Sequence, residues 1–209
     1  MSLVKYNNNS ISAVTSTALA IGDRILIKTL TASSSANLSF VHGSNGVVLD
    51  NTYPIYVFKF IDCHPATNEQ QLYMSGSVNS GSNYEATNKI TTCFRAYHSE
   101  SGSSGTLSYY AAGDIANSTD SAFLTVESSN ENDHAASGEM LLFNPSNTTF
   151  VKHFISRSNA VYNDSSDFSM NFHVAGFFKT ASAINGIRFR FNSGNMDSGT
   201  IKLYGIKDS

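Results

Sequence analysis

Apolar and polar side chains alternate with a period of two residues along much of this chain, and this alternation constrains the fold more than any other feature. In the segment 168–174 every second residue is apolar, and serine, asparagine and histidine lie between them. In the segment 187–191 two arginines alternate with an isoleucine and two phenylalanines. Alternate side chains point to opposite faces of a β-strand, so both segments are predicted to be half-buried strands. The segment 150–155 is also predicted to be a strand, with apolar side chains on both faces.

Helical patterns are nearly absent from the sequence. The best candidate is a single turn near Gly113–Asn117. Serine, threonine, asparagine and glycine are abundant between the apolar runs, and these residues favour turns over helix interiors. Further strands are predicted from β-branched and aromatic content at Arg24–Leu30, Asn37–Val41, Tyr53–Ile61, Gln71–Met74, Thr91–Tyr97, Phe123–Val126 and Glu139–Phe143.

Many short strands without intervening amphipathic helices predict an all-β fold, an antiparallel β-sandwich of jelly-roll-like form. The chain has 209 residues and no long linker, so a single domain is expected. Residues 21–209 are assigned to this β-sandwich domain. Residues 1–20 are polar and weakly patterned, and they are assigned to an N-terminal arm or a first edge segment.

The composition argues against several classes of function. Charged residues make up 14% of the chain and the net charge is −3, so the chain lacks the basic field that binds nucleic acids. No apolar stretch approaches the roughly 18 residues that cross a bilayer, and residues 1–9 lack the apolar core of a secretory signal. A protein made in the cytoplasm is therefore expected. Cys63 and Cys93 could pair, but two buried thiols are favoured in that compartment.

No compact catalytic or cofactor motif is present, so a non-enzymatic protein is predicted. The six histidines lack a metal-ligand spacing, although His153 and His173 could face each other across a sheet. No Gly-x-Ser-x-Gly nucleophile motif occurs. Two acidic loops could bind Ca²⁺ through oxygen ligands, but neither has EF-hand spacing and solvated loops are favoured. Their carboxylates are Glu131 and Asp133 in one loop and Asp164 and Asp167 in the other.

The chain has ten tyrosines and no tryptophan. A tyrosine ring beside asparagine and aspartate can stack on a sugar, but tyrosine also packs its ring in sheets and interfaces while its hydroxyl stays in water. The packing role is favoured. The tyrosines in or near polar loops are Tyr84, Tyr97, Tyr109, Tyr110 and Tyr162.

The C-terminal segment 184–207 is predicted to be a hairpin of two strands joined by a polar loop. Gly194 and Gly199 are suited to positive φ in that loop. Gly205 leaves space for a bulky ring across the sheet. The residues of this segment predicted to lie in the core are Ile187, Phe189, Phe191, Ile201 and Leu203.

This C-terminal segment resembles the C-terminal signature of virion structural proteins from marine tailed bacteriophages, including those that infect cyanobacteria and SAR11-type bacteria. The signature elements are Ser-Gly-Asn at 193–195, Ser-Gly-Thr at 198–200 and Leu-Tyr-Gly-Ile-Lys at 203–207. Residues 3–11, 48–56, 143–146 and 149–153 also resemble that group. The resemblance implies a component of the phage particle and leaves its position there open.

Composition, strand pattern and resemblance together predict a non-enzymatic structural protein on the exterior of the virion. The favoured role is capsid decoration through protein–protein contacts, with self-association as a homotrimer and with the major capsid protein or tail components as further partners. The alternative is a tail-fibre or tail-tip module that binds a host-surface glycan like a lectin. A polysaccharide-degrading enzyme is a third alternative, for which the sequence holds no motif.

Overall fold

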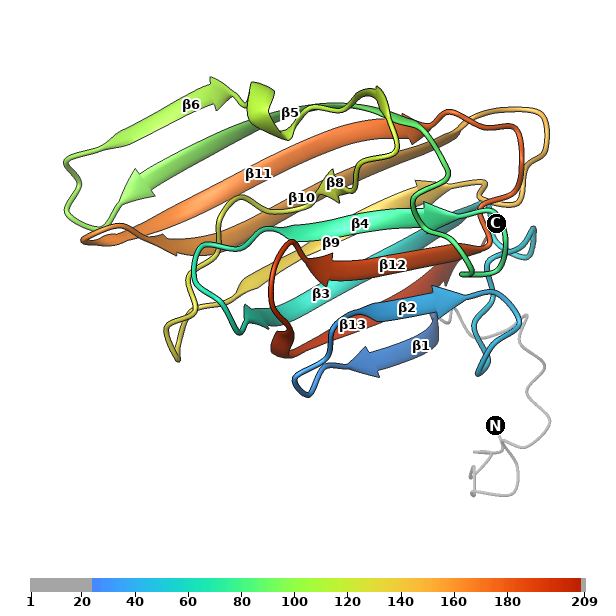
Figure 1. Cartoon of the computed structure of the whole chain (residues 1–209), viewed down its shortest axis with the longest axis horizontal. Helices are drawn as coiled ribbons and strands as arrows, with labels where there is room; N and C mark the ends of the chain where they lie inside the picture. The colour runs from blue at the N-terminus through green and yellow to red at the C-terminus, as the bar shows by residue number, and fades with distance from the viewer. Residues whose placement is uncertain (1–23, 208–209) are drawn as a thin grey trace, which may run out of the picture.

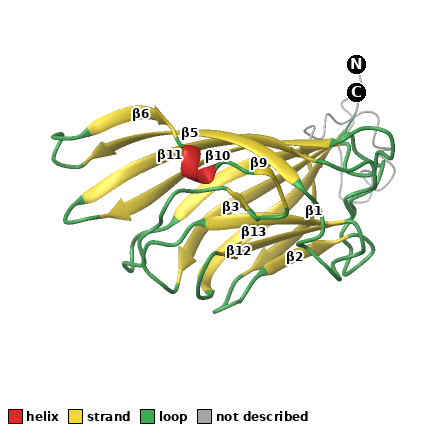
Figure 2. Ribbon diagram, turned by 45° about the horizontal axis from the view of Figure 1, so that its top comes forward, coloured by secondary structure: helices red, strands yellow, loops and turns green. Residues whose placement is uncertain are grey.

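Two antiparallel β-sheets pack face to face in the computed structural model, which describes residues 24–207 (Figure 1 and Figure 2). This confirms the predicted all-β sandwich. The assignment of residues 1–20 to an arm falls outside the described residues. Within residues 24–207 no helix is long and apolar enough to span a membrane.

The sheets differ in size. The larger sheet has nine strands in the order β1-β13-β3-β9-β10-β11-β5-β6, with β7 paired to β5. These strands are β1 (Arg24–Thr31), β3 (Ile55–Pro65), β5 (Lys89–Ser99), β6 (Gly105–Tyr109), β7 (Ala116–Ser118), β9 (Ala136–Phe143), β10 (Lys152–Asn163), β11 (Asp167–Phe178) and β13 (Met196–Ile206). The smaller sheet has the order β2-β12-β4-β8, made of β2 (Leu38–Val41), β12 (Gly186–Phe191), β4 (Leu72–Ser77) and β8 (Ala122–Phe123).

The core lies between the sheets and is built from the alternate residues that face inward. Phe40 of β2, Phe58 of β3 and Phe189 of β12 meet there, with ring centroids 5.3 Å apart for Phe40–Phe58 and 5.2 Å apart for Phe58–Phe189. Each such aromatic pair adds about 0.5–1.5 kcal/mol to the stabilisation from burial alone. The aromatic cluster therefore joins the two sheets across the middle of the sandwich.

The predicted C-terminal hairpin is wrong, although its predicted core residues are all buried. β12 pairs with β2 and β4 in the smaller sheet, whereas β13 pairs with β1 and β3 in the larger one. The two strands thus face each other across the core instead of sharing a ladder. Gly194 and Gly199 have φ of 71° and 123°, as predicted. The chain between β12 and β13 crosses from one sheet to the other.

Gly205 has the close aromatic neighbour that the sequence predicted. A Cβ atom on Gly205 would lie 2.3 Å from the ring of Tyr53, closer than two such atoms can approach. The ring of Tyr53 in turn packs edge-on against Tyr56, with centroids 5.7 Å apart. The glycine therefore lets an aromatic pair cover the end of β13.

Two predicted elements differ from the structure. Of the strand predicted at Phe123–Val126, only Phe123 lies in a ladder, as the last residue of β8. Leu124 N still donates to Leu72 O, but side-chain hydroxyls take the next positions, since Leu72 N donates to Thr125 Oγ1 and Ser158 Oγ donates to Leu124 O. The helical turn predicted near Gly113–Asn117 is displaced to a 3₁₀ turn at Ala111–Gly113. The residues that follow form β7, which pairs with the edge of β5. The edge strand β6 was not predicted.

Two lysines are fully buried at one end of the larger sheet. Lys152, Phe178 and Lys89 lie directly opposite one another on β10, β11 and β5. Lys89 Nζ donates to Thr87 O at 2.9 Å and Thr119 O at 3.1 Å, and it lies 5.7 Å from the centre of the Phe178 ring. Lys152 Nζ donates to three carbonyls, of which Phe150 O is nearest at 2.8 Å. Backbone carbonyls thus replace water around both ammonium groups.

Burial lowers the pKa of Lys89 to about 8, because desolvation disfavours its charged form. The unfolded chain then binds more protons than the folded chain between pH 8 and the ordinary lysine pKa, so the free energy of unfolding should rise with pH in that window. Between pH 8 and 9 we expect the free energy of unfolding of wild type to rise by about 1 kcal/mol more than that of Lys89→Met, measured by urea unfolding at each pH. Lys179→Met removes an exposed lysine, so its free energy of unfolding should change with pH as that of wild type does. An equal change of the free energy of unfolding with pH in all three proteins would contradict the prediction.

Candidate functional site

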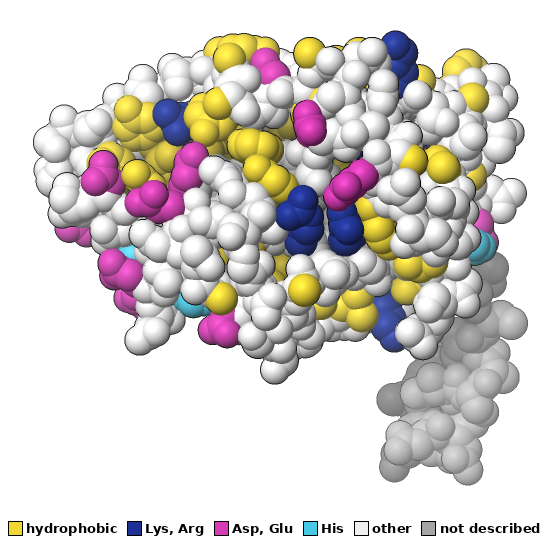
Figure 3. Space-filling view, in the orientation of Figure 1, with side chains coloured by type: hydrophobic (Ala, Val, Ile, Leu, Met, Phe, Trp, Pro, Cys, Tyr) yellow, Lys and Arg dark blue, Asp and Glu magenta, His cyan; other side chains and the backbone are white. Residues whose placement is uncertain are grey.

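A pocket of about 510 Å³ lies on the inner face of the larger sheet, where β5, β10 and β11 extend beyond the smaller sheet (Figure 1 and Figure 3). Three of the tyrosines singled out in the sequence line it. We call it the tyrosine pocket; its lining is Tyr97, Tyr110, Tyr162, Arg95, Phe168, Met170, Ser104, Glu69, Glu127 and Asp164. Figure 3 shows apolar side chains here with several acidic side chains around them.

The floor of the tyrosine pocket is a set of packed aromatic rings. Phe168 of β11 contacts Tyr97 of β5 at a centroid distance of 5.9 Å and Tyr162 of β10 at 6.0 Å. Arg95 lies two residues before Tyr97 on the same face of β5. Its guanidinium is 4.4 Å from the centre of the Tyr110 ring and 5.5 Å from that of Tyr97. Cation–π contact therefore holds the two tyrosines and the arginine in one orientation.

Carboxylates make the rim of the tyrosine pocket acidic. Glu127 accepts hydrogen bonds from Tyr110 Oη at 3.2 Å and from Gln71 Nε2 at 2.9 Å. Burial, together with this neighbouring carboxylate, raises the pKa of Tyr110 to about 12. Glu69 and Asp164 are exposed on the same rim, and Arg95 is the one cationic side chain among the lining residues.

Aromatic faces beside carboxylate acceptors and a guanidinium donor suit a ligand with an apolar ring face and several hydroxyl groups. Glu69, Glu127, Asp164 and Ser104 are the other polar groups of the lining, which holds no histidine, cysteine or lysine among the described residues. The tyrosines were visible in the sequence, but nothing there marked Arg95 or Glu127 as their neighbours.

A second candidate surface lies on the opposite, outer face of the larger sheet. The side chains of Leu107, Tyr109, Ile155, Phe94 and Ile90 are 71%, 63%, 49%, 46% and 36% exposed. Ladder partners share a face, so Phe94 lies beside Tyr109, and Ile90 lies beside Phe177. We call Ile90, Phe94, Leu107, Tyr109, Ile155 and Phe177 the outer-face patch. In the sequence, the only indication of this outer-face patch is that the strand predicted at 150–155 has apolar residues on both faces.

The outer-face patch includes a shallow depression of about 430 Å³ beside Gly176. The small side chain of Ala175 lies at its floor, opposite Ile155 and Thr92 in the ladders, whereas a Cβ atom on Gly176 would point inward against Thr91 and Phe154. Its lining is almost entirely apolar, and Ile90, Ile155 and Phe177 form its walls. Apolar surface of this kind on a soluble protein commonly marks a contact site.

The two histidines on predicted facing strands do not form a metal site. His153 lies opposite Phe177 and His173 lies opposite Arg157, so the two histidines are offset along the β10–β11 ladder. Each ring packs on an aromatic neighbour instead, with His173 stacked on Phe94 at 4.8 Å between ring centroids. Both are ordinary positions on the outer face.

Cys63 and Cys93 are buried free thiols, as predicted. They lie on β3 and β5, which β9, β10 and β11 separate. Burial raises the pKa of each thiol to about 12, so neither is a reactive thiolate at neutral pH.

The remaining predicted residues lie apart from the tyrosine pocket. Tyr84 packs against Arg188 near the smaller sheet, at 4.7 Å from ring centre to guanidinium. Tyr109 donates a hydrogen bond to Asp114 on the edge of the larger sheet. The two acidic loops come together, because Asp133 and Asp167 both contact His134. Asp133 and Asp167, which belong to two separate acidic loops in the sequence, thus share one histidine neighbour.

Comparison of the chain with protein-family models, with curated proteins and with solved structures finds no match.

The contact between Tyr110 and Glu127 gives a test of how rigid the tyrosine pocket is. Tyr110→Phe removes one hydrogen bond while Gln71 still contacts Glu127, so the free energy of unfolding should fall by about 1 kcal/mol in urea denaturation. Tyr204→Phe is the matched control, because the Tyr204 hydroxyl makes no hydrogen bond to another described residue. Equal stability of the two variants would contradict a packed, preorganised pocket.

Proposed function

We propose that this chain is a structural component of the exterior of a phage particle, a decoration-type β-sandwich that acts through protein–protein contacts. The outer-face patch carries the proposal. It exposes five large side chains, four of them purely apolar, on the outer face of the larger sheet. A protein with only 14% charged residues has few charges to keep such a face from associating.

The occupant proposed for the outer-face patch is a second copy of the same chain, in a homotrimer. The patch reaches the edge strand β6, whose outer side bears Leu107 and Tyr109. An interface that includes an edge strand also satisfies the backbone groups which that edge leaves unpaired. The phage assignment itself is supported by the sequence resemblance of residues 193–207 and of the four further segments.

A charge placed in the outer-face patch tests this proposal. Ile155→Asp should weaken self-association by at least about 2 kcal/mol, about 30-fold in the dissociation constant, since it removes apolar contact and buries a carboxylate. Light scattering after size exclusion should give a trimer for wild type and a monomer for the variant. Leu26→Asp makes the same change on β1, at the far edge of the sheet, and should stay trimeric.

Capsid binding completes the test. Wild type should bind to phage capsids that lack their decoration protein, and Ile155→Asp should lose that binding. A wild-type monomer that does not bind such capsids would overturn the proposal.

The tyrosine pocket supports a second candidate function, recognition of a host-surface glycan. Its three tyrosines, its arginine and its acidic rim are the groups that bind a sugar by stacking and hydrogen bonding. This function is compatible with a position on a tail fibre or tail tip.

Glycan binding can be separated from self-association by substituting the pocket alone. Tyr162→Ala and Tyr97→Ala should each weaken binding on a glycan array or to host cells by about tenfold, through loss of a stacking face. Tyr109→Ala removes a more exposed tyrosine outside the pocket and should bind like wild type. Absence of any wild-type binding to host cells and their polysaccharides would exclude this second function.

A further inference from the structure

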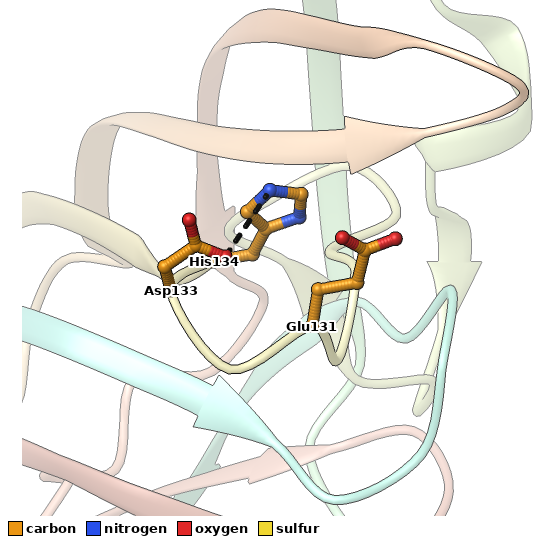
Figure 4. Close-up of side chains that lie close together, drawn as sticks. All are labelled: Glu131, Asp133 and His134. Atoms are coloured by element: carbon orange, nitrogen blue, oxygen red, sulfur yellow. Dashed lines mark ion pairs between the residues drawn. The ribbon is translucent and has the colours of Figure 1, made fainter.

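The loop between β8 and β9 gathers three side chains that can bind a metal ion. Glu131, Asp133 and His134 each offer one ligand atom, and these atoms lie within 4.8 Å of one another (Figure 4). A tight turn holds them together, because His134 N donates to Glu131 O at 2.9 Å. Glu131 O also contacts His64 Nε2 at 3.1 Å, which ties the turn to β3.

His134 differs from a solvated histidine because it is 94% buried, with 6% of its surface exposed, and its Nδ1 atom has no hydrogen-bond partner. In Figure 4 the dashed line joins Nε2 to Asp133, and the other ring nitrogen lies on the side of Glu131. The unpartnered nitrogen therefore faces Glu131, and the exposed side chain of Asp133, which lies 3.8 Å from Nε2, has to turn toward Nδ1 to share an ion with it. Buried polar atoms without a partner are rare in folded proteins, so this atom requires an explanation.

Asp167 determines which nitrogen of His134 is free. Its Oδ2 atom lies 3.3 Å from Nε2 at the start of β11. A carboxylate can only accept, so it favours the proton on Nε2 and leaves the lone pair on Nδ1. Metal-binding histidines are held in the same way, with a carboxylate on one ring nitrogen and the metal on the other.

We propose that Glu131, Asp133 and Nδ1 of His134 bind one divalent transition-metal ion of the zinc type, with Asp167 as the positioning residue. An imidazole with carboxylates suits Zn²⁺, whereas Ca²⁺ prefers a shell of oxygen atoms alone. Ligand atoms around a tetrahedral zinc ion are about 3.3 Å apart, given bonds of about 2.0–2.1 Å. The cluster needs to contract by about 1.5 Å or less, and the exposed side chains of Glu131 and Asp133 can move that far.

The ion would fasten this loop to the start of β11 through the contact between His134 and Asp167. The same chain segment carries Glu127, which lines the tyrosine pocket. Backbone hydrogen bonds from Ser129 N to Val161 O and from Val161 N to Ala135 O already tie this segment to β10, and the ion would add a tie to β11.

Titration calorimetry on the full chain, stripped with a chelator, tests the site. Wild type should bind one equivalent of Zn²⁺ and should not bind Ca²⁺ at the same concentration. His134→Asn and Glu131→Gln should each weaken Zn²⁺ binding at least about tenfold, and Asp167→Asn about tenfold through misplacement of the ring. Because Glu131 is exposed, Glu131→Gln keeps the test valid if His134→Asn fails to fold. Glu85→Gln makes the same charge change near the smaller sheet and should bind like wild type.

Nitrogen NMR of the histidine rings supplies a readout that a purely structural role would not change. Zn²⁺ should shift the Nδ1 resonance of His134 and leave that of His173 unchanged. Failure of wild type to bind Zn²⁺, equal binding by Glu131→Gln and wild type, or tighter binding of Ca²⁺ than of Zn²⁺ would each overturn the proposal.

Discussion

Burial of the two inner sheet faces against each other is the constraint on which the rest of this structure depends. Alternate residues of the strands are apolar, and neither sheet can leave them in water without losing roughly 1.5–3 kcal/mol for each large side chain. Phe40 and Phe189 of the smaller sheet pack against Phe58 of the larger sheet, so their rings join the two inner faces. Even the buried ammonium groups of Lys89 and Lys152 follow from this packing, since backbone carbonyls at the sheet end solvate them.

The unequal sizes of the sheets create the tyrosine pocket. Along the inner side of β5, Cys93 is buried against the segment that carries Tyr110 and Gly113, whereas Arg95 and Tyr97 lie further along the strand and are half-buried. Amphipathic side chains replace purely apolar ones where the covering sheet ends, because rings can pack there while polar atoms reach water. The aromatic floor of the pocket is thus a consequence of an uncovered sheet face, and its rim comes from loops that join strands of both sheets.

The outer-face patch and the His134 cluster show why candidate sites were only partly predictable. Both faces of the segment 150–155 were recognised as apolar, and Ile155 is indeed exposed. Its neighbours on the patch come from β5 and β6, however, and strand order cannot be read from residue alternation. In the same way Glu131 and Asp133 were recognised as possible ligands, but the contact of His134 with Asp167 joins residues that are 33 positions apart.

By itself the sequence determined the fold class, the approximate positions of most long strands and the residues that face the core, including Phe189 and Leu203. A period of two is a local property, so it reports which side of a strand is buried. It does not report which strand is the neighbour, and for that reason the pattern predicts a hairpin of β12 and β13 although they belong to opposite sheets. Only the tertiary structure decided the pairing, the overhang of the larger sheet and the sites that depend on them, because each results from contacts between distant segments.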